Sequence, residues 1–143
     1  MTRGHILLVE DNQSDERLTL RALGKIKVAN VIDVVRDGQQ ALDYLFAEGE
    51  FASRAGGPPP VVVLLDLNLP RVSGHDVLIR LRADPRTRLV PVVVLTSSDE
   101  DRDRVAAYGC GANSFVRKPV VFEEFADTIG RIGLYWLITN APP

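Results

Sequence analysis

The sequence predicts an α/β domain built on a parallel sheet, and three observations indicate this fold class. Residues 61–65, Val-Val-Val-Leu-Leu, form an unbroken aliphatic run that is typical of a strand buried on both faces. Four other short apolar runs alternate with helix-like segments, which favours parallel strands joined by right-handed crossovers. Polar residues follow most of these runs, at the sheet edge where such folds bind ligands.

Length and composition indicate one globular domain. The chain has 143 residues, of which 45% are apolar and 25% are charged. A net charge of −2 without a basic stripe argues against nucleic-acid binding. No apolar run approaches the roughly 18 residues of a membrane span, and the first apolar run is too short to be expected as the apolar region of a signal peptide. Because the single Cys110 cannot form an internal disulfide, a cytoplasmic location is expected.

The first part of the chain contains two strands and two helices. Residues 6–9 form the first strand, and Ser14 is expected to cap the helix that follows, whose first turn is acidic. Residues 31–35 form the second strand, and its interruption by Asp33 indicates a position near the edge of the sheet. A short helix is expected over residues 40–46.

Residues 47–60 form the least regular stretch, with three glycines and three prolines. This composition predicts a loop, and its length is unusual inside a compact domain. Both a mobile loop and a loop packed on a partner agree with this composition.

The last part of the chain continues the alternation. The expected elements are a helix opened by Ser73, a strand over residues 91–96, a helix from about 99 to 109, a strand over 114–116 and a helix over about 122–137. Apolar residues cover more than one face of the last helix, which favours contact with a partner or with its own tail.

Four of the five predicted strands end in a polar side chain of chemical interest. The first ends in Glu10 and Asp11, the third in Asp66, the fourth in Thr96 and the fifth in Lys118. Because parallel strands end at one edge, these groups are expected to converge. Clustered carboxylates repel one another, and a hard divalent cation such as Mg²⁺ relieves that repulsion.

These groups together suit a phosphoryl group carried on Asp66. Its oxygens would lie near the metal ion, the Lys118 ammonium and the Thr96 hydroxyl, and the protein would supply position and charge neutralisation. Each residue alone has an ordinary explanation as a cap, a strand end or a surface charge. Their occurrence in this order, each at its own strand end, favours a phosphoryl-transfer site.

Four ordered motifs resemble the receiver domain of bacterial response regulators. They are Ile-Leu-Leu-Val-Glu-Asp-Asn at residues 6–12, Leu-Leu-Asp-Leu-Asn-Leu-Pro at 64–70, Val-Leu-Thr-Ser-Ser at 94–98 and Phe-Val-Arg-Lys-Pro at 115–119. The resemblance covers about residues 5–138. It implies a flavodoxin-like three-layer sandwich with strand order 2-1-3-4-5, and a single receiver domain over residues 1–143 without an output domain.

The resemblance also implies roles for individual residues in two-component signalling. Asp66 would accept a phosphoryl group from a sensor histidine kinase, and Lys118 would pair with that group. Asp11, Asp66 and the backbone carbonyl of Asn68 would bind Mg²⁺, with Glu10 assisting. The chemistry would be limited to the protein's own phosphorylation and dephosphorylation, so the protein is not expected to be an enzyme.

Thr96 and Phe115 would form the switch. On phosphorylation Thr96 would move to the phosphoryl oxygen and Phe115 would turn inward, which changes the surface of the fourth helix, fifth strand and fifth helix for a partner. Unlike a tyrosine, Phe115 has no hydroxyl group, so its ring cannot form a hydrogen bond to a partner.

A narrower resemblance links residues 132–137 and the long loop to small regulators paired with phytochrome-type histidine kinases. Homodimers through the fourth helix, fifth strand and fifth helix are common in that subfamily. The resemblance therefore implies a dimer interface that includes Phe122, Tyr135 and Trp136.

Three other classes of protein are weighed against this interpretation. A phosphate-independent receiver-like scaffold commonly loses one member of the acid–threonine–lysine set, which is intact here. An aspartate-nucleophile phosphatase requires a second aspartate where Asn68 stands, and it carries that motif on its first strand. A flavodoxin-type electron carrier requires a phosphate loop where Glu10 and Asp11 would repel the cofactor.

Overall fold

The structure is a computed structural model that describes residues 4–25, 31–97, 100–118 and 121–142. Its elements alternate between strands and helices along the chain. They are β1 (His5–Val9), α1 (Gln13–Gly24), β2 (Val31–Val35), α2 (Gly38–Phe46), the 3₁₀ helix η1 (Gly49–Arg54), β3 (Val62–Leu65), α3 (Gly74–Ala83), β4 (Val92–Thr96), α4 (Asp101–Gly109), β5 (Ser114–Arg117), α5 (Phe122–Leu134) and the π-helix η2 (Tyr135–Thr139).

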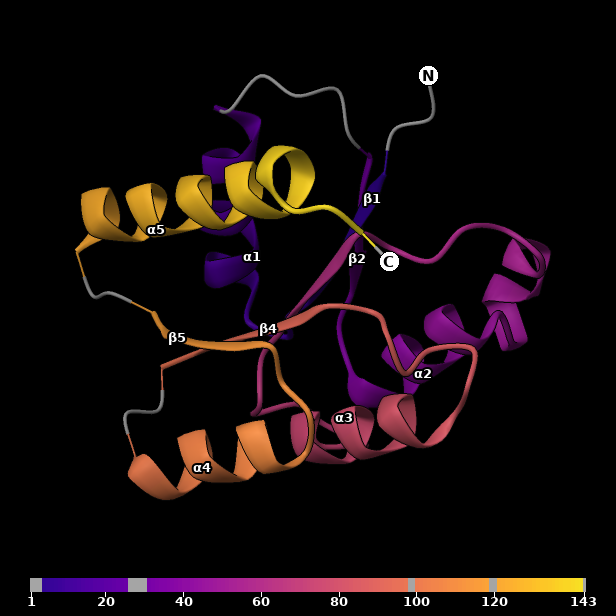
Figure 1. The fold of residues 1–143 in the computed structure, drawn as a ribbon. Coiled ribbons are helices and arrows are strands. Elements are labelled where there is room, and N and C mark those ends of the chain that lie inside the picture. The colour runs from indigo at the N-terminus through magenta and orange to yellow at the C-terminus, as the bar shows by residue number, and fades with distance from the viewer. Residues whose placement is uncertain (1–3, 26–30, 98–99, 119–120, 143) are drawn as a thin grey trace.

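The five strands form one parallel sheet in the order β2-β1-β3-β4-β5, which confirms the predicted topology. Helices α1 and α5 cover one face of the sheet, and α2, α3 and α4 cover the other (Figure 1). The result is the predicted three-layer, flavodoxin-like arrangement. Strand β2 lies at one edge, as the interruption by Asp33 indicated.

The central strands bury both of their faces because alternate side chains enter different hydrophobic clusters. Leu7, Val63 and Val94 face the cluster formed with α2, α3 and α4. Their neighbours in the chain, such as Leu8 and Leu64, face the cluster formed with α1 and α5. This double burial explains why the run at residues 61–65 is continuous rather than alternating.

Helix α1 begins two residues earlier than the sequence indicated. Its cap is Asn12, whose Oδ1 accepts a hydrogen bond of 2.9 Å from the backbone N–H of Asp15. The prediction of Ser14 as the cap is therefore wrong, and asparagine is an equally favourable capping residue. Ser73 does cap α3, since its Oγ accepts a hydrogen bond of 3.2 Å from the N–H of Asp76.

The segment at residues 47–60 is more ordered than predicted, because it contains η1 and packs on its own domain. The ring of Phe51 meets the buried Tyr44 ring edge to face, with centroids 5.3 Å apart. The guanidinium carbon of Arg54 lies 3.5 Å from the centroid of the Tyr44 ring, and the Arg54 guanidinium donates a hydrogen bond to the Tyr44 backbone carbonyl. The Tyr44 hydroxyl in turn donates to Asp33 on β2, at 2.5 Å. Neither a free loop nor a partner is needed to explain these contacts.

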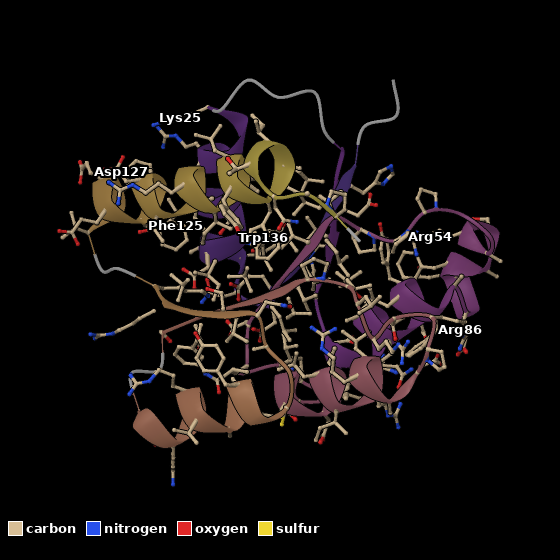
Figure 2. All side chains as sticks on the ribbon, in the orientation of Figure 1. Lys25, Arg54, Arg86, Phe125, Asp127 and Trp136 are labelled. Carbon is tan, nitrogen blue, oxygen red and sulfur yellow. The ribbon has the colours of Figure 1, made fainter. Side chains whose placement is uncertain are left out.

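The last helix is also divided differently from the prediction. Regular α-helix ends at Leu134, and a π-helical turn carries the chain on to Thr139. Phe125 is buried and Trp136 half-buried on the side of the sheet (Figure 2). Tyr135 and Ile138 are 48% and 61% exposed. Some apolar residues of this helix therefore pack into the core of the domain, and others form an exposed surface.

Arg82 on α3 joins two turns at the opposite end of the sheet from the phosphoryl site predicted above. Its guanidinium donates to the carbonyls of Gly111, Val90 and Arg88 at 2.9, 2.8 and 3.0 Å, and to Asn113 Oδ1 at 3.0 Å. Gly111 has φ +105°, and a Cβ there would lie 2.6 Å from Arg82 Cγ. Glycine thus supplies both the turn and the space for the arginine.

Over the described stretches of chain, no helix reaches the length and apolar character required to cross a bilayer.

Candidate functional site

The polar residues at the strand ends converge at the carboxyl edge of the sheet. Lys118, which follows β5, donates from Nζ to Glu10 Oε1 at 2.5 Å and to Asp66 Oδ2 at 3.1 Å. Glu10 follows β1 and Asp66 follows β3. A backbone hydrogen bond of 2.8 Å from Lys118 N–H to the Thr96 carbonyl extends the pairing of β4 and β5 by one step and brings the lysine to this edge.

Asp15 is a further member of this cluster that no sequence motif indicated. Its Oδ2 accepts a hydrogen bond of 2.9 Å from Lys118 Nζ, although 103 residues separate the two in the chain. The acidic first turn of the helix was visible in the sequence, but it suggested only a favourable interaction with the helix dipole. What brings Asp15 to the lysine is the start of α1 at Gln13, immediately after the strand-end acids.

Glu10, Asp11 and Asp66 form the cluster that suits a cation. Each offers one carboxylate oxygen, and these oxygens all lie within 4.8 Å of one another. Glu10 and Asp66 are buried, whereas Asp11 is exposed. Such an all-oxygen donor set, with room for water beside Asp11, fits a hard divalent cation.

Burial and charge perturb the ionisable groups here. Burial raises the pKa of Glu10 to about 7; Lys118 opposes this shift and the negative charge of Asp66 adds to it. For Lys118 burial alone lowers the pKa, but Asp66, Glu10 and Asp15 together raise it above its usual value. The lysine is therefore held as a buried cation. The negative charges of its carboxylate partners together outnumber its single positive charge.

Both carboxylate oxygens of Asp66 are held by hydrogen bonds. Oδ1 accepts from the backbone N–H of Asn68 at 3.0 Å, and Oδ2 accepts from Lys118. The turn is also confined by α3, because a Cβ on Gly74 would lie 2.6 Å from the Asp66 carbonyl oxygen. The carboxylate is consequently fixed in direction before any ligand arrives.

The predicted switch residues lie on neighbouring strands. Thr96 ends β4 and is fully buried, and Phe115 on β5 pairs in register with Val94. Side chains two residues apart share a face, so Thr96 and Phe115 lie on the same face of the sheet. Phe115 is half-buried against the cluster formed with α2, α3 and α4.

An open cavity of about 620 Å³ lies over the carboxylates. It is lined by Asp11, Asn12, Gln13, Asp15, Asp66, Asn68 and Ser97.

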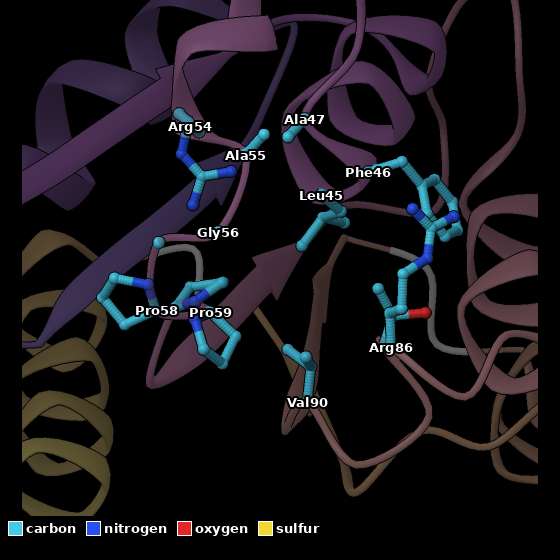
Figure 3. Close-up of a pocket in the computed structure, with 13 residues that line it drawn as sticks. Leu45, Phe46, Ala47, Arg54, Ala55, Gly56, Pro58, Pro59, Arg86 and Val90 are labelled. Carbon is cyan, nitrogen blue, oxygen red and sulfur yellow. The ribbon is translucent and has the colours of Figure 1, made fainter.

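A second pocket, of about 320 Å³, lies between α2, the segment after η1 and the turn before β4, with Arg54 and Arg86 on different sides (Figure 3). None of the predicted site residues, all of which the structure describes, lines that second pocket. The chemistry belongs to the first cavity.

The three predicted interface residues have different environments. The Phe122 ring packs on α1, with the Arg21 guanidinium carbon 5.2 Å and the Lys25 ammonium nitrogen 5.6 Å from its centroid. Trp136 packs on the core. Tyr135 presents about half of its surface to solvent, at 48% exposure.

This sheet edge, with its acids, threonine and lysine, defines a receiver, and comparison with known proteins agrees. Residues 6–130 match the family of response regulator receiver domains. The chain belongs to this family, and it is a response regulator of two-component signalling.

Three relatives are similar over almost the whole chain. Probable methanogenesis regulatory protein FilR2 of Methanothrix harundinacea is 44% identical over 139 residues, which cover 96% of this chain and 86% of FilR2. Response regulator Rcp1 of Synechocystis is 34% identical over 138 residues, covering 96% of this chain and 92% of Rcp1. The crystal structure of the Mn²⁺-bound form of Rcp1 has a TM-score of 0.90 and covers 98% of this chain and 99% of that one. The phosphorylated cyanobacterial phytochrome response regulator RcpA has a TM-score of 0.92 at 36% identity, with 99% of each chain covered.

Proposed function

We propose that this protein is a phosphorylation-controlled signalling module in which Asp66 accepts a phosphoryl group from a sensor histidine kinase. The observation that carries the proposal is the Asp66 carboxylate, held by Lys118 and the Asn68 N–H and lining an open polar cavity. A phosphorylated form of the relative RcpA supports the same chemistry for this chain.

In the proposed transfer, an Asp66 oxygen attacks phosphorus and the bond from phosphorus to the kinase histidine breaks. The histidine nitrogen keeps the electron pair of that bond, and Asp66 becomes an acyl phosphate. Water later attacks phosphorus, the bond to Asp66 breaks, and inorganic phosphate and the carboxylate are released. Lys118 and the Thr96 hydroxyl would balance the charge on the phosphoryl oxygens. Since only its own phosphoryl group turns over, the protein acts as a regulator rather than as an enzyme.

Mg²⁺ is the proposed cofactor, with Glu10, Asp11, Asp66 and the Asn68 carbonyl as its ligands. Glu10, Asp15 and Asp66 pair with the Lys118 ammonium, and Asp11 adds a fourth carboxylate beside Glu10 and Asp66. This excess of negative charge among the described residues supports a divalent cation. When bound, the ion would neutralise charge on the phosphoryl oxygens. The Mn²⁺-bound form of Rcp1 supports a divalent ion in a related protein.

The proposed output is a change of surface. Thr96 would move toward the phosphoryl group, Phe115 would follow, and the face made by α4, β5 and α5 would change its partner affinity. The shared sheet face of Thr96 and Phe115 supports this coupling. If the coupling fails, the phosphate-independent scaffold is the alternative function.

The proposed phosphodonor is a phytochrome-type kinase in the cytoplasm, a choice that rests on RcpA, a phytochrome response regulator. FilR2 is named for methanogenesis, which makes a kinase with another input the second candidate. Phosphotransfer from one kinase of each type, at equal concentration, would separate these two candidates.

Incubation with acetyl phosphate and Mg²⁺ should add about 80 Da, one phosphoryl group, to the wild type in intact-protein mass spectrometry. Asp66→Asn should gain nothing, because the amide is a poor nucleophile. A beryllofluoride-binding control identifies a receiver whose phosphoryl group is lost too fast to detect. A folded wild type that neither gains mass nor binds beryllofluoride would contradict the proposed function and favour the scaffold.

We also propose a homodimer through the α4, β5 and α5 face. The exposed apolar residues Tyr135 and Ile138 at the end of this face support it, at 48% and 61% exposure. Replacing both with glutamate should reduce the mass measured by light scattering from two chains to one. Leu89→Glu is a matched control, because Leu89 is equally apolar and 64% exposed but lies before β4.

An unchanged mass in the double variant would remove this helix end from the interface. Phe122 and Trp136 are less suitable targets, since both pack on their own domain.

A further inference from the structure

Of the described carboxylates that contact Lys118, Asp15 is the one to which the proposed phosphoryl transfer gives no direct role. The Lys118 ammonium has three N–H donors. Among the residues that the structure describes, its carboxylate contacts are with Glu10 at 2.5 Å, Asp15 at 2.9 Å and Asp66 at 3.1 Å. A phosphoryl group on Asp66 can take over the hydrogen bond that Asp66 now accepts. A second hydrogen bond from the lysine to the phosphoryl group requires Glu10 or Asp15 to give one up.

The three carboxylates differ in how easily they can release the lysine. The Glu10 and Asp66 side chains are 2% and 10% exposed, whereas the Asp15 side chain is 31% exposed. Asp15 also lines the open cavity, where water can replace the lysine as its partner. Release costs least where the freed carboxylate becomes hydrated, which selects Asp15.

The position of Asp15 is fixed by the backbone of α1 rather than by its side chain. Its N–H donates to Asn12 Oδ1, so the residue is held in the first helical turn whatever group it carries. The next residue, Glu16, pairs with Arg36 at 3.0 Å. Asp15 and Glu16 are thus adjacent acids in one turn that pair with different cations. Substitutions at Glu16 can therefore serve as matched controls for substitutions at Asp15.

We propose that Asp15 is a positioning residue that occupies the third donor of Lys118 in the unphosphorylated receiver and yields it to the phosphoryl group on Asp66. This inference rests on the proposed function. Asp15 then competes with the phosphoryl group for the lysine, and its charge also repels the incoming anion. Both effects act in one direction, so Asp15 lowers the affinity of the site for a phosphoryl group.

The test is the affinity for beryllofluoride, a phosphoryl analogue, measured by calorimetry at saturating Mg²⁺. Asp15→Asn should bind about fivefold more tightly than the wild type, the size of effect of a partly exposed ion pair. Asp15→Ala should show the same gain, which excludes a new contact made by the amide. Glu16→Gln should bind like the wild type, because Glu16 pairs with Arg36.

A double-mutant cycle with Lys118→Ala separates competition for the lysine from general repulsion. The gain from Asp15→Asn should become smaller when the lysine is absent, because only the repulsion of the anion then remains. A gain of unchanged size there, or equal affinities of Asp15→Asn and the wild type, would overturn the role of Asp15 and leave the proposed function standing. A wild type that does not bind beryllofluoride and gains no mass from acetyl phosphate would overturn both.

Discussion

Lys118→Ala should destabilise the magnesium-free protein by about 3 kcal/mol, the cost of removing one partner from a buried ion pair. The ammonium contacts Glu10 and Asp66, both buried, and its loss leaves their like charges facing each other. Mg²⁺ should restore most of the lost stability, because the ion neutralises the same carboxylates. The measurement is urea unfolding of both proteins in chelator and in saturating Mg²⁺.

The loss should also depend on pH. The pKa of Glu10 is already raised to about 7 by burial, and removing Lys118 raises it further. A carboxyl whose folded pKa is raised binds more protons in the folded state, so its contribution to stability is lost as the pH rises through that pKa. The defect of Lys118→Ala should therefore be smaller at about pH 6 than at about pH 8. An equal loss at both pH values and with Mg²⁺ would show that the ammonium does not act through these carboxylates.

The same variant tests the coupling to the surface. Lys118→Ala should still accept phosphate from acetyl phosphate, yet fail to change conformation when it does. A normal shift in the amide resonances of β5 on phosphorylation would assign the coupling to other residues. Lys25→Ala, which removes an exposed lysine, is the control and should change stability by less than about 0.5 kcal/mol.

Arg82→Ala should cost about 3 kcal/mol of unfolding free energy, although Arg82 is far from the phosphoryl site. The substitution removes a cation that bonds four backbone carbonyls, including that of Thr87, and one side-chain amide oxygen across two turns. Hydrogen bonds to a charged group are worth more than neutral ones, and part-buried carbonyls would lose their partners. Chemical denaturation at fixed pH measures the difference.

Arg82→Lys should recover only part of this stability, since an ammonium cannot reproduce the planar fork of a guanidinium. Arg80→Ala is the matched control on the same helix, because Arg80 is exposed. It should change the unfolding free energy by less than about 0.5 kcal/mol. Equal losses for Arg80→Ala and Arg82→Ala would mean that the contacts of Arg82 carry no special stability.

The sequence predicts the fold well because its main signals are local. A continuous aliphatic run such as residues 61–65 can be buried only on both sides, and alternation of strands and helices leaves few topologies. The convergence of Glu10, Asp66 and Lys118 was predicted from the same rule, since parallel strands end together. Element boundaries were less accurate, as the cap at Asn12 shows, because several residue types cap a helix equally well.

Contacts without a sequence signature were missed. Asp15 reaches its lysine across 103 residues, and only the exact start of α1 decides whether it does. Arg82 binds backbone carbonyls, which every residue type carries. The side-chain types in the sequence therefore do not predict these contacts. Apolar residues such as Phe122 and Trp136 suggested an interface, but hydrophobicity does not distinguish a neighbouring helix from a second chain.

The distance along the chain between Glu10 and Lys118 has a consequence for biosynthesis. The acids of the first strand leave the ribosome 108 residues before the lysine that neutralises them. A nascent chain that has made four strands therefore carries the carboxylates at its sheet edge without their ammonium. The chain gains that counterion only after β5, its last strand, has been synthesised and pairs with β4.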